Sequence, residues 1–404
     1  MKKDILLLSE WFDPEPTFKG LFFAKKLIEQ GFKVRVLTGF PNYPGGKIYE
    51  GYKLRLYQKE YIDGVEIIRV PIFPSHDKSA FKRALTYFSF FLFSLAFGIF
   101  LRRPNLIYAY HPPITTGLSA IFLKKIYRVP LVYDIQDLWP DTLHSTGMIN
   151  NRHLLNFINI FCNLVYKTAD HVVVLSDGFK LKLQERGIPK NKISVIYNWC
   201  NESKLLEGLD DSLIETSNNK FNIIFTGNIG KAQGLNNLLK AAEALLESTP
   251  NIHFTLYGDG LEFYEIENKI SSMKLRNISI HRAVPMNKIG KFIHNADAFL
   301  VHLINDPLFE ITIPSKTQVG MFFGRPIIMS VSGDAAKIVK NANCGYIVKP
   351  ENTGDLIATI KIIASQDKNK LRSLGNNGKK YYEENFSIDS GVKKFSSLFN
   401  SLIN

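Results

Sequence analysis

The feature that most constrains the fold is an alternation of short apolar runs with longer amphipathic stretches along the whole chain. The runs are continuously apolar and rich in β-branched residues, which is typical of parallel strands covered on both faces. Helical patterns lie between the runs, so the sequence predicts two doubly wound, Rossmann-like α/β domains. The predicted strands of the first half are Ile5–Ser9, Lys33–Thr38, Val65–Val70, Asn105–Tyr110, Leu131–Ile135, His171–Leu175 and Ile193–Tyr197. Those of the second half are Asn222–Thr226, Ile252–Tyr257, Ile278–His281, Ala298–Leu303, Ile327–Met329 and Tyr346–Val348.

Length and composition agree with two folded domains. A chain of 404 residues is longer than a single domain usually is. Its composition, with 45% hydrophobic and 22% charged residues, excludes a disordered or low-complexity chain. The polar, acid-rich segment 201–220 is predicted to be a linker with a short helix, which places the domains at 1–200 and 201–386. Cys162, Cys200 and Cys344 form no CxxC pair, so neither a disulfide framework nor a thiolate zinc site is expected. The cysteine content fits a protein of the reducing cytosol.

Positive charge is concentrated in the first half of the chain. Residues 1–200 hold 27 Lys and Arg against 16 Asp and Glu, a balance of +11, whereas residues 201–404 hold 23 against 21, a balance of +2. A basic half suits nucleic acid, an anionic membrane surface or a phosphate-bearing substrate. Nucleic acid is not expected as a partner, because the cations are dispersed and no finger, basic heptad or RNP-like strand is present.

The segment 85–101 is uncharged, carries seven aromatic residues and is flanked by Lys82, Arg83, Arg102 and Arg103. Three interpretations compete for it: a buried helix, a helix that dips its aromatic face into one leaflet, and a membrane span. A span would interrupt a parallel sheet whose strands lie on both sides, and seventeen residues is at the lower limit of length. The basic flanks favour peripheral contact of residues 81–103 with an anionic membrane.

Two glycine-containing loops are candidates for anion binding. Lys19 and Gly20 precede a helix after the first strand, where backbone N–H groups and the helix dipole attract an anion; the alternative is that Gly20 only permits a tight turn. The second domain opens with Gly227-Asn228-Ile229-Gly230-Lys231-Ala232-Gln233-Gly234, which can place backbone donors and an ammonium group around phosphate oxygens. The alternative there is a flexible turn with a solvated lysine. Neither loop has the dinucleotide or Walker A spacing.

Lys316 is a further candidate cation. It lies in the first turn of a predicted helix, where the macrodipole disfavours positive charge, so either a dianionic ligand lies nearby or the lysine is solvated. Ser315 or Thr312 is expected to cap this helix.

Polar side chains also follow the predicted strands of the first half. Asp134, Asp137 and Asp141 lie at or after a strand's carboxyl end, where open α/β sheets bind ligands, and each suits a base, a sugar contact or a helix cap. His111 has a similar position, with a core or turn role as the alternative. No HExxH, GxSxG or DxD-type pair supports metal catalysis or acyl transfer.

Taken in order, these segments resemble the family 4 glycosyltransferases, which have the two-domain GT-B fold. The resemblance covers the Lys19-Gly20 loop, the 227–234 loop, Tyr257-Gly258-Asp259-Gly260, Pro314-Ser315-Lys316 and Gly324-Arg325-Pro326. The segments 40–52, 70–77, 110–113, 133–141 and 313–318 are similar to a narrower group that adds L-fucosamine-type (FucNAc) residues to lipid-linked O-antigen or capsule precursors.

The resemblance implies two domains facing a central cleft and metal-independent transfer with retention. It further implies a UDP-sugar as the donor substrate, no cofactor, and a polyprenyl diphosphate-linked saccharide as the acceptor. It also implies a C-terminal helix over 387–404 that returns to the first domain, and a location on the inner face of the bacterial cytoplasmic membrane. For catalysis it implies Lys231, Lys316, Glu310, Asp137 and Gln136. For donor binding it implies Lys19, Gly20, Gly227, Asn228, Gly230, Gln233, Gly258, Asp259, Gly260, Val284, Ser315 and Gln318, and for acceptor binding His111, Asp134 and Asp141.

The chain departs from the family pattern at several of these positions. Asn228 and Gln233 stand where many members have Arg and Lys, and Lys231 is expected to be a relocated cation. The paired glutamates seven residues apart are not intact, since Glu310 is one position off and Val319 occupies the second position. Two other functions remain open: a UDP-sugar 2-epimerase of the same fold, and a two-lobed sugar-binding protein without catalysis.

Overall fold

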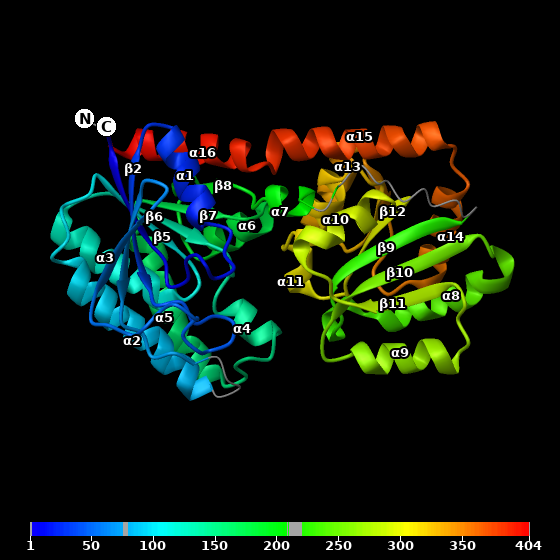
Figure 1. The fold of residues 1–404 in the computed structure, drawn as a ribbon, viewed down its shortest axis with the longest axis horizontal. Coiled ribbons are helices and arrows are strands. Elements are labelled where there is room, and N and C mark those ends of the chain that lie inside the picture. The colour runs from blue at the N-terminus through cyan, green and yellow to red at the C-terminus, as the bar shows by residue number, and fades with distance from the viewer. Residues whose placement is uncertain (1, 76–79, 208, 210–219, 404) are drawn as a thin grey trace. The chain divides into compact units, whose positions relative to one another are not determined.

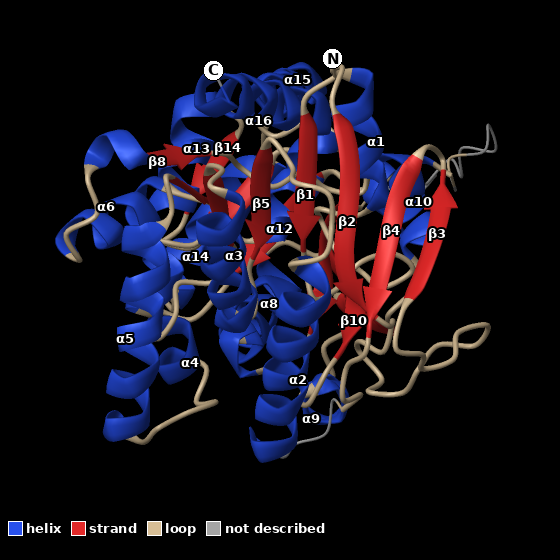
Figure 2. Ribbon diagram, turned by 90° about the vertical axis from the view of Figure 1, so that its left-hand side faces the viewer, coloured by secondary structure: helices blue, strands red, loops and turns tan. Residues whose placement is uncertain are grey.

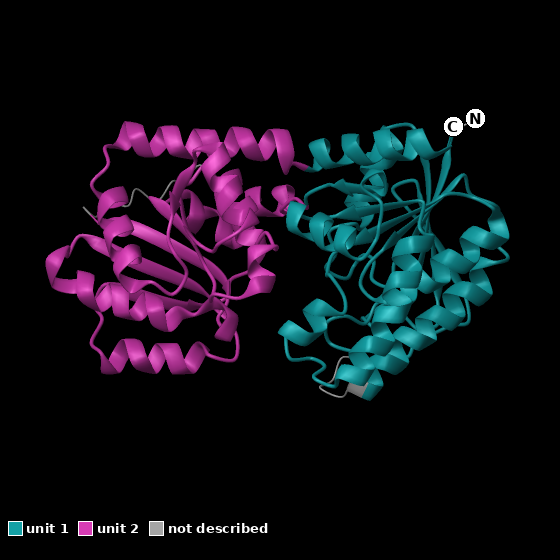
Figure 3. Ribbon diagram, turned by 180° about the vertical axis from the view of Figure 1, so that it is seen from behind, with its two compact units in different colours: residues 1–197, 388–404 teal, residues 198–387 magenta. Residues whose placement is uncertain are grey.

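The computed structural model describes residues 2–75, 80–207, 209 and 220–403. His76 and Asp77, which end the 70–77 motif, and most of the predicted linker over 201–220 lie outside the described residues. The chain divides into two compact units, residues 1–197 with 388–404 (unit 1) and residues 198–387 (unit 2), coloured separately in Figure 3. Each unit has its own sheet and its own core.

Unit 1 contains a sheet in the order β3-β4-β2-β1-β5-β6-β7-β8, parallel except for β3 at its edge (Figure 2). The sequence pattern did not predict β3, because its residues are mostly polar and lie on an exposed edge. The strands are β1 (Asp4–Leu8), β2 (Lys33–Gly39), β3 (Gln58–Ile62), β4 (Val65–Val70), β5 (Leu106–Tyr110), β6 (Leu131–Ile135), β7 (His171–Val174) and β8 (Ile193–Val195).

Helices cover both faces of this sheet (Figure 1). They are α1 (Leu21–Glu29), α2 (Ala80–Gly98), α3 (Ile114–Tyr127), α4 (Asp141–Ser145), α5 (Arg152–Thr168), α6 (Asp177–Glu185), the 3-10 turn η1 (Lys190–Lys192) and the C-terminal α16 (Ile388–Ile403). Helix α16 packs on unit 1, where the rings of Phe395 and Phe399 lie 5.5 and 5.6 Å from the ring of Tyr108 on β5.

Unit 2 contains a parallel sheet in the order β11-β10-β9-β12-β13-β14, which is the 3-2-1-4-5-6 order of a Rossmann fold. The strands are β9 (Phe221–Asn228), β10 (Ile252–Asp259), β11 (Ile278–Arg282), β12 (Ala298–His302), β13 (Ile327–Ser330) and β14 (Gly345–Ile347). The helices are α7 (Glu202–Leu206), η2 (Lys231–Gln233), α8 (Leu235–Ser248), α9 (Phe263–Ser272), α10 (Met286–His294), α11 (Pro307–Glu310), α12 (Ser315–Phe322), α13 (Asp334–Ala342), α14 (Thr353–Ala364) and α15 (Lys368–Asn385). Both units are therefore doubly wound α/β folds, as the sequence predicts.

The strand order places one switch point in each sheet. In unit 1 the strand β1 lies between β2, which follows it in the chain, and β5, where the chain crosses to the other side of the sheet. In unit 2 the strand β9 lies between β10 and β12 in the same way. Open α/β sheets bind ligands outside the carboxyl ends of the strands at such points, because the loops there diverge. The residues that follow β1, β5, β9 and β12 are therefore the first to consider as a site.

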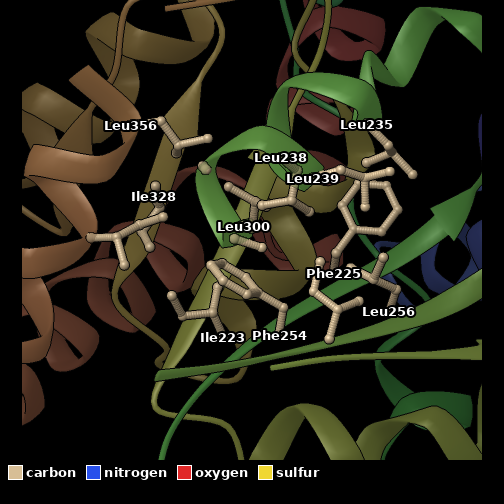
Figure 4. Close-up of a cluster of buried hydrophobic side chains, with 14 of the residues drawn as sticks. Ile223, Phe225, Leu235, Leu238, Leu239, Phe254, Leu256, Leu300, Ile328 and Leu356 are labelled. Atoms are coloured by element: carbon tan, nitrogen blue, oxygen red, sulfur yellow. The ribbon is translucent and has the colours of Figure 1, made fainter. Parts of the chain in front are cut away.

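The core of unit 2 is an apolar cluster between its sheet and helices α8 and α14 (Figure 4). Phe225, Phe254 and Leu256 from the strands pack against Leu238 and Leu239 from α8. These side chains are buried because they lie on the side of β9 and β10 that the apolar face of the amphipathic α8 covers.

A matched pair of leucines tests this core. Leu256 on β10 is 0% exposed and Leu261 in the following turn is 100% exposed. We expect Leu256→Ala to lower the free energy of unfolding of unit 2 by about 2–5 kcal/mol, because it removes packed atoms and leaves a cavity. Leu261→Ala should change it by less than about 0.5 kcal/mol. Urea denaturation followed by circular dichroism measures both, and equal effects would contradict the described packing.

Candidate active site

The site in unit 2 begins where β9 and β10 lie closest. Gly227 and Gly258 are paired in register, and a side chain at Gly258 would overlap the carbonyl oxygen of Gly227. Gly227 has a φ of +121°, which L residues rarely adopt. A Cβ there would lie 3.0 Å from Cε and 3.1 Å from Nζ of Lys316, so the lysine side chain lies directly against this backbone.

Lys316 is an ammonium group without a carboxylate beside it. It belongs to the first turn of α12, its Nζ lies 4.6 Å from the ring centroid of Phe225, and no ion pair to it is formed within the described chain. Burial lowers the pKa of Lys316 to about 8. A cation that is largely withdrawn from water at a helix N-terminus is unfavourable by itself, since both desolvation and the helix dipole oppose the charge. A bound dianion would remove this cost.

The start of α12 has no side-chain cap. Pro314 is the N-cap residue, so the expectation that Ser315 or Thr312 caps this helix is wrong. The hydroxyl of Thr312 instead donates to the carbonyl oxygen of Leu308 at 2.7 Å, because both belong to the turn of α11. Ser315 is exposed at the first position of α12, while the amide of Gln318 is buried and donates to the carbonyl oxygens of Ser315 and Pro314 at 2.9 Å. Gln318 thus holds the turn that carries Lys316.

The loop after β9 is held by Gln233. Its Oε1 accepts hydrogen bonds from Nδ2 of Asn228 at 3.1 Å and from the backbone N–H of Gly230 at 3.2 Å. Nδ1 of the buried His302, at the end of β12, lies 2.7 Å from the carbonyl oxygen of Gln233. These bonds fix the loop at the switch point, and Lys231 lies exposed in the η2 turn. His302 is not predicted from the sequence, because no motif surrounds it.

The turn after β10 lies beside the same loop. A side chain at Gly260 would overlap the carbonyl oxygen of Ile229, and Asp259 forms an ion pair with Arg282 at 2.7 Å. Arg282 also stacks 3.8 Å from the ring centroid of Phe263. The carboxylate of Asp259 is therefore paired with a cation of the same unit. Val284 lies half-buried in the loop after β11.

Glu310 ends α11 with its side chain exposed. Its carbonyl oxygen lies where a side chain at Gly333 would be, so the two loops pack by their backbones. The structure thus brings Gly227, Gly258, Gly260 and Lys316 together and sets Glu310 five residues before the α12 turn. Whether Glu310 contacts a sugar stays a prediction.

In unit 1 the start of α1, where the sequence predicts an anion site, lies beside an acid of the same unit. The N-terminus of this helix is occupied by the protein's own Asp13, whose Oδ2 accepts a hydrogen bond from the backbone N–H of Leu21 at 2.5 Å. A side chain at Gly20 would overlap this carboxylate. Gly20 therefore makes room for Asp13, and a donor diphosphate on these amides would have to displace a carboxylate that is tethered in place.

Lys19 and Asp134 form part of a buried polar group. Lys19 is 1% exposed, lies 5.2 Å from the ring centroid of Phe395 on α16, and its pKa is lowered to about 8 by burial, which the charge of Asp134 opposes. Asp134 accepts hydrogen bonds from the hydroxyl of Tyr108 at 2.5 Å and from the amide of Gln136 at 2.7 Å. Both oxygens of Asp134 are therefore engaged inside unit 1, and ligand contacts by Lys19, Asp134 and Gln136 stay predictions.

Buried acids also lie near the β1–β5 switch point. Glu10, two residues after β1, is 0% exposed, and neither carboxyl oxygen has a hydrogen-bond partner of normal geometry among the described residues. Burial, with the neighbouring Glu15, raises the pKa of Glu10 well above its usual range, and burial raises the pKa of Glu15 to about 7. Glu10 is not predicted from the sequence, because a single acid after a strand belongs to no motif.

His111 and Asp137 follow the adjacent strands β5 and β6. Nδ1 of His111 accepts a hydrogen bond from the backbone N–H of Asp137 at 3.4 Å, and its Nε2 is buried without a partner among the residues described. Burial lowers the pKa of His111 to about 3 and raises that of Asp137, so the imidazole is neutral. A carboxyl group and an imidazole nitrogen thus remain available here. Asp141 differs, since it is paired with Arg186.

Comparison with known proteins assigns the family. Residues 23–199 match the model of the glycosyl transferase 4-like domain, and residues 214–381 match that of glycosyl transferases group 1. The two matches follow one another and span both units, so the chain belongs to the GT-B glycosyltransferases.

Individual relatives agree with this assignment. WcaI of Escherichia coli strain K12, named a colanic acid biosynthesis glycosyl transferase, is 25% identical over 88% of this chain and 91% of its own. WbjE of Pseudomonas aeruginosa, named a glycosyltransferase, is 22% identical over 78% of this chain and 79% of its own. The crystal structure of Anabaena HepE in complex with UDP has a TM-score of 0.72 and 17% identity, and covers 100% of both chains, which shows a shared fold.

The pKa of Lys316 predicts how UDP binding depends on pH. Above pH 8 the ammonium loses its proton and no longer attracts a diphosphate, so we expect affinity to fall by up to about tenfold per pH unit. In Lys316→Arg the guanidinium stays protonated, and the fall should flatten. Calorimetric titration from pH 7 to 9 measures both proteins. Equal slopes would mean that the diphosphate does not contact Lys316.

Proposed function

We propose that the chain transfers a sugar from a UDP-sugar, UDP-N-acetyl-L-fucosamine, to a polyprenyl diphosphate-linked saccharide in the synthesis of a bacterial surface polysaccharide. The reaction is independent of metal and retains the anomeric configuration. The protein works at the inner face of the cytoplasmic membrane. The observation that carries the proposal is Lys316, a largely buried cation that lies against Gly227 at the start of α12.

Relatives support the ligand classes. HepE has been crystallised with UDP and with UDP-glucose, WaaG is a glycosyltransferase involved in lipopolysaccharide biosynthesis, and WcaI is named for colanic acid biosynthesis. A nucleotide diphosphate and a polysaccharide precursor are therefore the substrates we assign to this chain. The FucNAc specificity rests on the motif resemblance of the sequence.

Lys316 gives the proposal its chemistry. When the bond between the sugar and the diphosphate breaks, negative charge develops on the leaving phosphate. The ammonium group and the uncapped N–H groups of α12 stabilise that charge without moving, because Gln318 holds the turn. Lys231, exposed on the loop after β9, adds a second cation.

For the acceptor, unit 1 offers Glu10, Asp137 and Nε2 of His111. Glu10 and His111 are buried and Asp137 is half-buried, and carboxyl and imidazole groups of this kind suit the hydroxyls of a saccharide. Trp139 and Tyr87 lie beside them, with ring centroids 5.1 Å from His111 and 6.3 Å from Trp139 respectively. Aromatic faces next to carboxyl groups are a suitable surface for a sugar ring.

A single assay tests the transfer. Protein in lipid micelles receives a panel of UDP-sugars with polyprenyl diphosphate N-acetylglucosamine, and the lipid fraction is analysed by mass spectrometry. We expect a gain of one sugar with UDP-N-acetyl-L-fucosamine. Lys316→Ala should reduce turnover by roughly 10²–10³-fold, as loss of a charge-stabilising group does. Lys361→Ala, an exposed lysine on α14, should stay within about twofold.

Other outcomes of the assay change the conclusion. Conversion of the UDP-sugar without any acceptor would assign a 2-epimerase. Tight donor binding with no product at all would assign a binding protein. Full activity of Lys316→Ala would remove the proposed phosphate site.

The membrane contact is supported by the orientation of α2. Its buried face is lined by Thr86, Phe90, Ser94 and Gly98, and the hydroxyl of Ser94 lies 2.8 Å from that of Ser119 on α3. The exposed face carries Phe81, Phe88 and Leu92. The apolar side of the helix is thus turned outward. In the part of the chain that the structure describes, no helix is long and apolar enough to cross a bilayer.

Charge reversal tests this contact. The variant with Lys82, Arg83, Arg102 and Arg103 all changed to Glu should lose at least tenfold in binding to vesicles of anionic phospholipid, because each cation adds about 1 kcal/mol of attraction near the surface. Reversal of four exposed lysines on unit 2, Lys240, Lys288, Lys340 and Lys361, is the control. Sedimentation with vesicles measures binding, and unchanged binding of the first variant would contradict the contact.

A further inference from the structure

The exposed apolar surface of unit 1 is wider than α2. Helices α2, α3 and α5 pack side by side in that order, and their outer sides lie together in Figure 2. Helix α3 exposes Phe122 and Ile126, and α5 exposes Phe157, Ile160 and Leu164, with Ile160 64% exposed. We call the outer surface of these three helices the three-helix face.

Helix α5 shows most clearly that this exposure is organised. Its inner side is already apolar, with Cys162, Val165 and Tyr166 buried against the unit. Phe157, Ile160 and Leu164 are spaced three and four residues apart, so they form a second apolar stripe on the side away from that core. Exposed polar residues on this side lie toward the start and end of the helix, at His153, Asn156 and Lys167, so the apolar stripe occupies its middle turns.

The charges around this face have one sign. From Ala80 to Tyr133 the chain has seven Lys and Arg residues and no Asp or Glu, and from Thr142 to Ala169 it has Arg152 and Lys167 and again no acid. Lys125, Arg128, Arg152 and Lys167 are exposed. Lys124 on α3 forms an ion pair with Asp170, which follows the end of α5, at 2.9 Å.

We infer that the whole three-helix face, with α5 as its outer part, lies on an anionic phospholipid surface. Helices whose outer sides expose apolar residues and whose own charged residues are all cations fit the boundary of acyl chains and anionic headgroups. A protein partner would require charge pairing or a mixed rim, and a second copy of the same face would bring like charges together. The inference deepens the proposed membrane contact and rests on it, since it assigns α3 and α5 to the same surface.

The test compares two triple variants. Phe157→Ser, Ile160→Ser and Leu164→Ser together remove the stripe of α5, and Leu261→Ser, Tyr264→Ser and Ile362→Ser remove three exposed apolar residues of unit 2. In sedimentation with phosphatidylglycerol vesicles, the α5 variant should bind at least tenfold more weakly than the unchanged protein. The control variant should bind as strongly as the unchanged protein. Binding of the α5 variant equal to that of the unchanged protein would overturn the inference. Calorimetry with UDP, which needs no vesicle, checks that both variants keep the unit 2 site.

A labelling experiment gives a second readout that does not depend on loss of binding. Ile160→Cys can be labelled with an environment-sensitive dye, because the three native cysteines are buried. We expect its emission to shift to the blue on phosphatidylglycerol vesicles, not on phosphatidylcholine, and not for the control Tyr264→Cys. Unshifted emission from bound protein would overturn the assignment of α5.

Two results separate this inference from the activity. A protein that transfers sugar in micelles but shows no dye shift would leave the proposed function and overturn the three-helix face. A protein that shifts on vesicles but transfers no sugar would support the face and contradict the transferase. Sedimentation velocity without lipid adds the last case: a dimer that the α5 variant abolishes would assign the face to a second copy and overturn the lipid contact.

Discussion

The contact between β9 and β10 at Gly227 and Gly258 is the constraint on which the unit 2 site depends. The two backbones approach so closely that a side chain at Gly258 would overlap Gly227, and the space beside Gly227 is filled by Lys316. The loop after β9 keeps its place through Gln233 and His302, at the point where the strand order reverses. Backbone packing therefore determines where the cation lies, and the cation determines what can bind.

The two units treat their buried charges differently. In unit 1 Asp13 occupies the start of α1, and Lys19 lies near Asp134 under the rings of α16, so these charges are compensated by the protein itself. In unit 2 Lys316 has no acid beside it within the described chain. An uncompensated buried charge costs stability unless a ligand pairs with it. This contrast is why we assign the diphosphate to unit 2, and why groups such as Glu10, whose pKa burial raises, and the neutral His111 suit sugar hydroxyls in unit 1.

The sequence predicted both sheets, because continuous apolar runs mark parallel strands whatever their partners are. It did not predict β3, a polar edge strand, or the role of Gly20, where an acid seven residues away fills the expected anion site. Lys316 could be selected because its sign opposes the helix dipole, which is a local property. Glu10 could not, since its burial comes from strands and loops distant in the chain. The outward apolar stripe of α5 was not predicted either. Periodicity alone does not tell which side of a helix packs on the sheet when both sides carry apolar residues.

The central claim is that Lys316 holds the diphosphate, and the most direct measurement is the pKa of that one lysine. Lysine labelled with ¹³C at the ε carbon gives a resonance for each side chain, and the Lys316→Arg variant assigns the signal. The account predicts a pKa near 8 in the protein alone and a clear rise when UDP binds, since a nearby dianion favours the ammonium form. A pKa that starts near that of the exposed lysines, or that does not move with UDP, would contradict it.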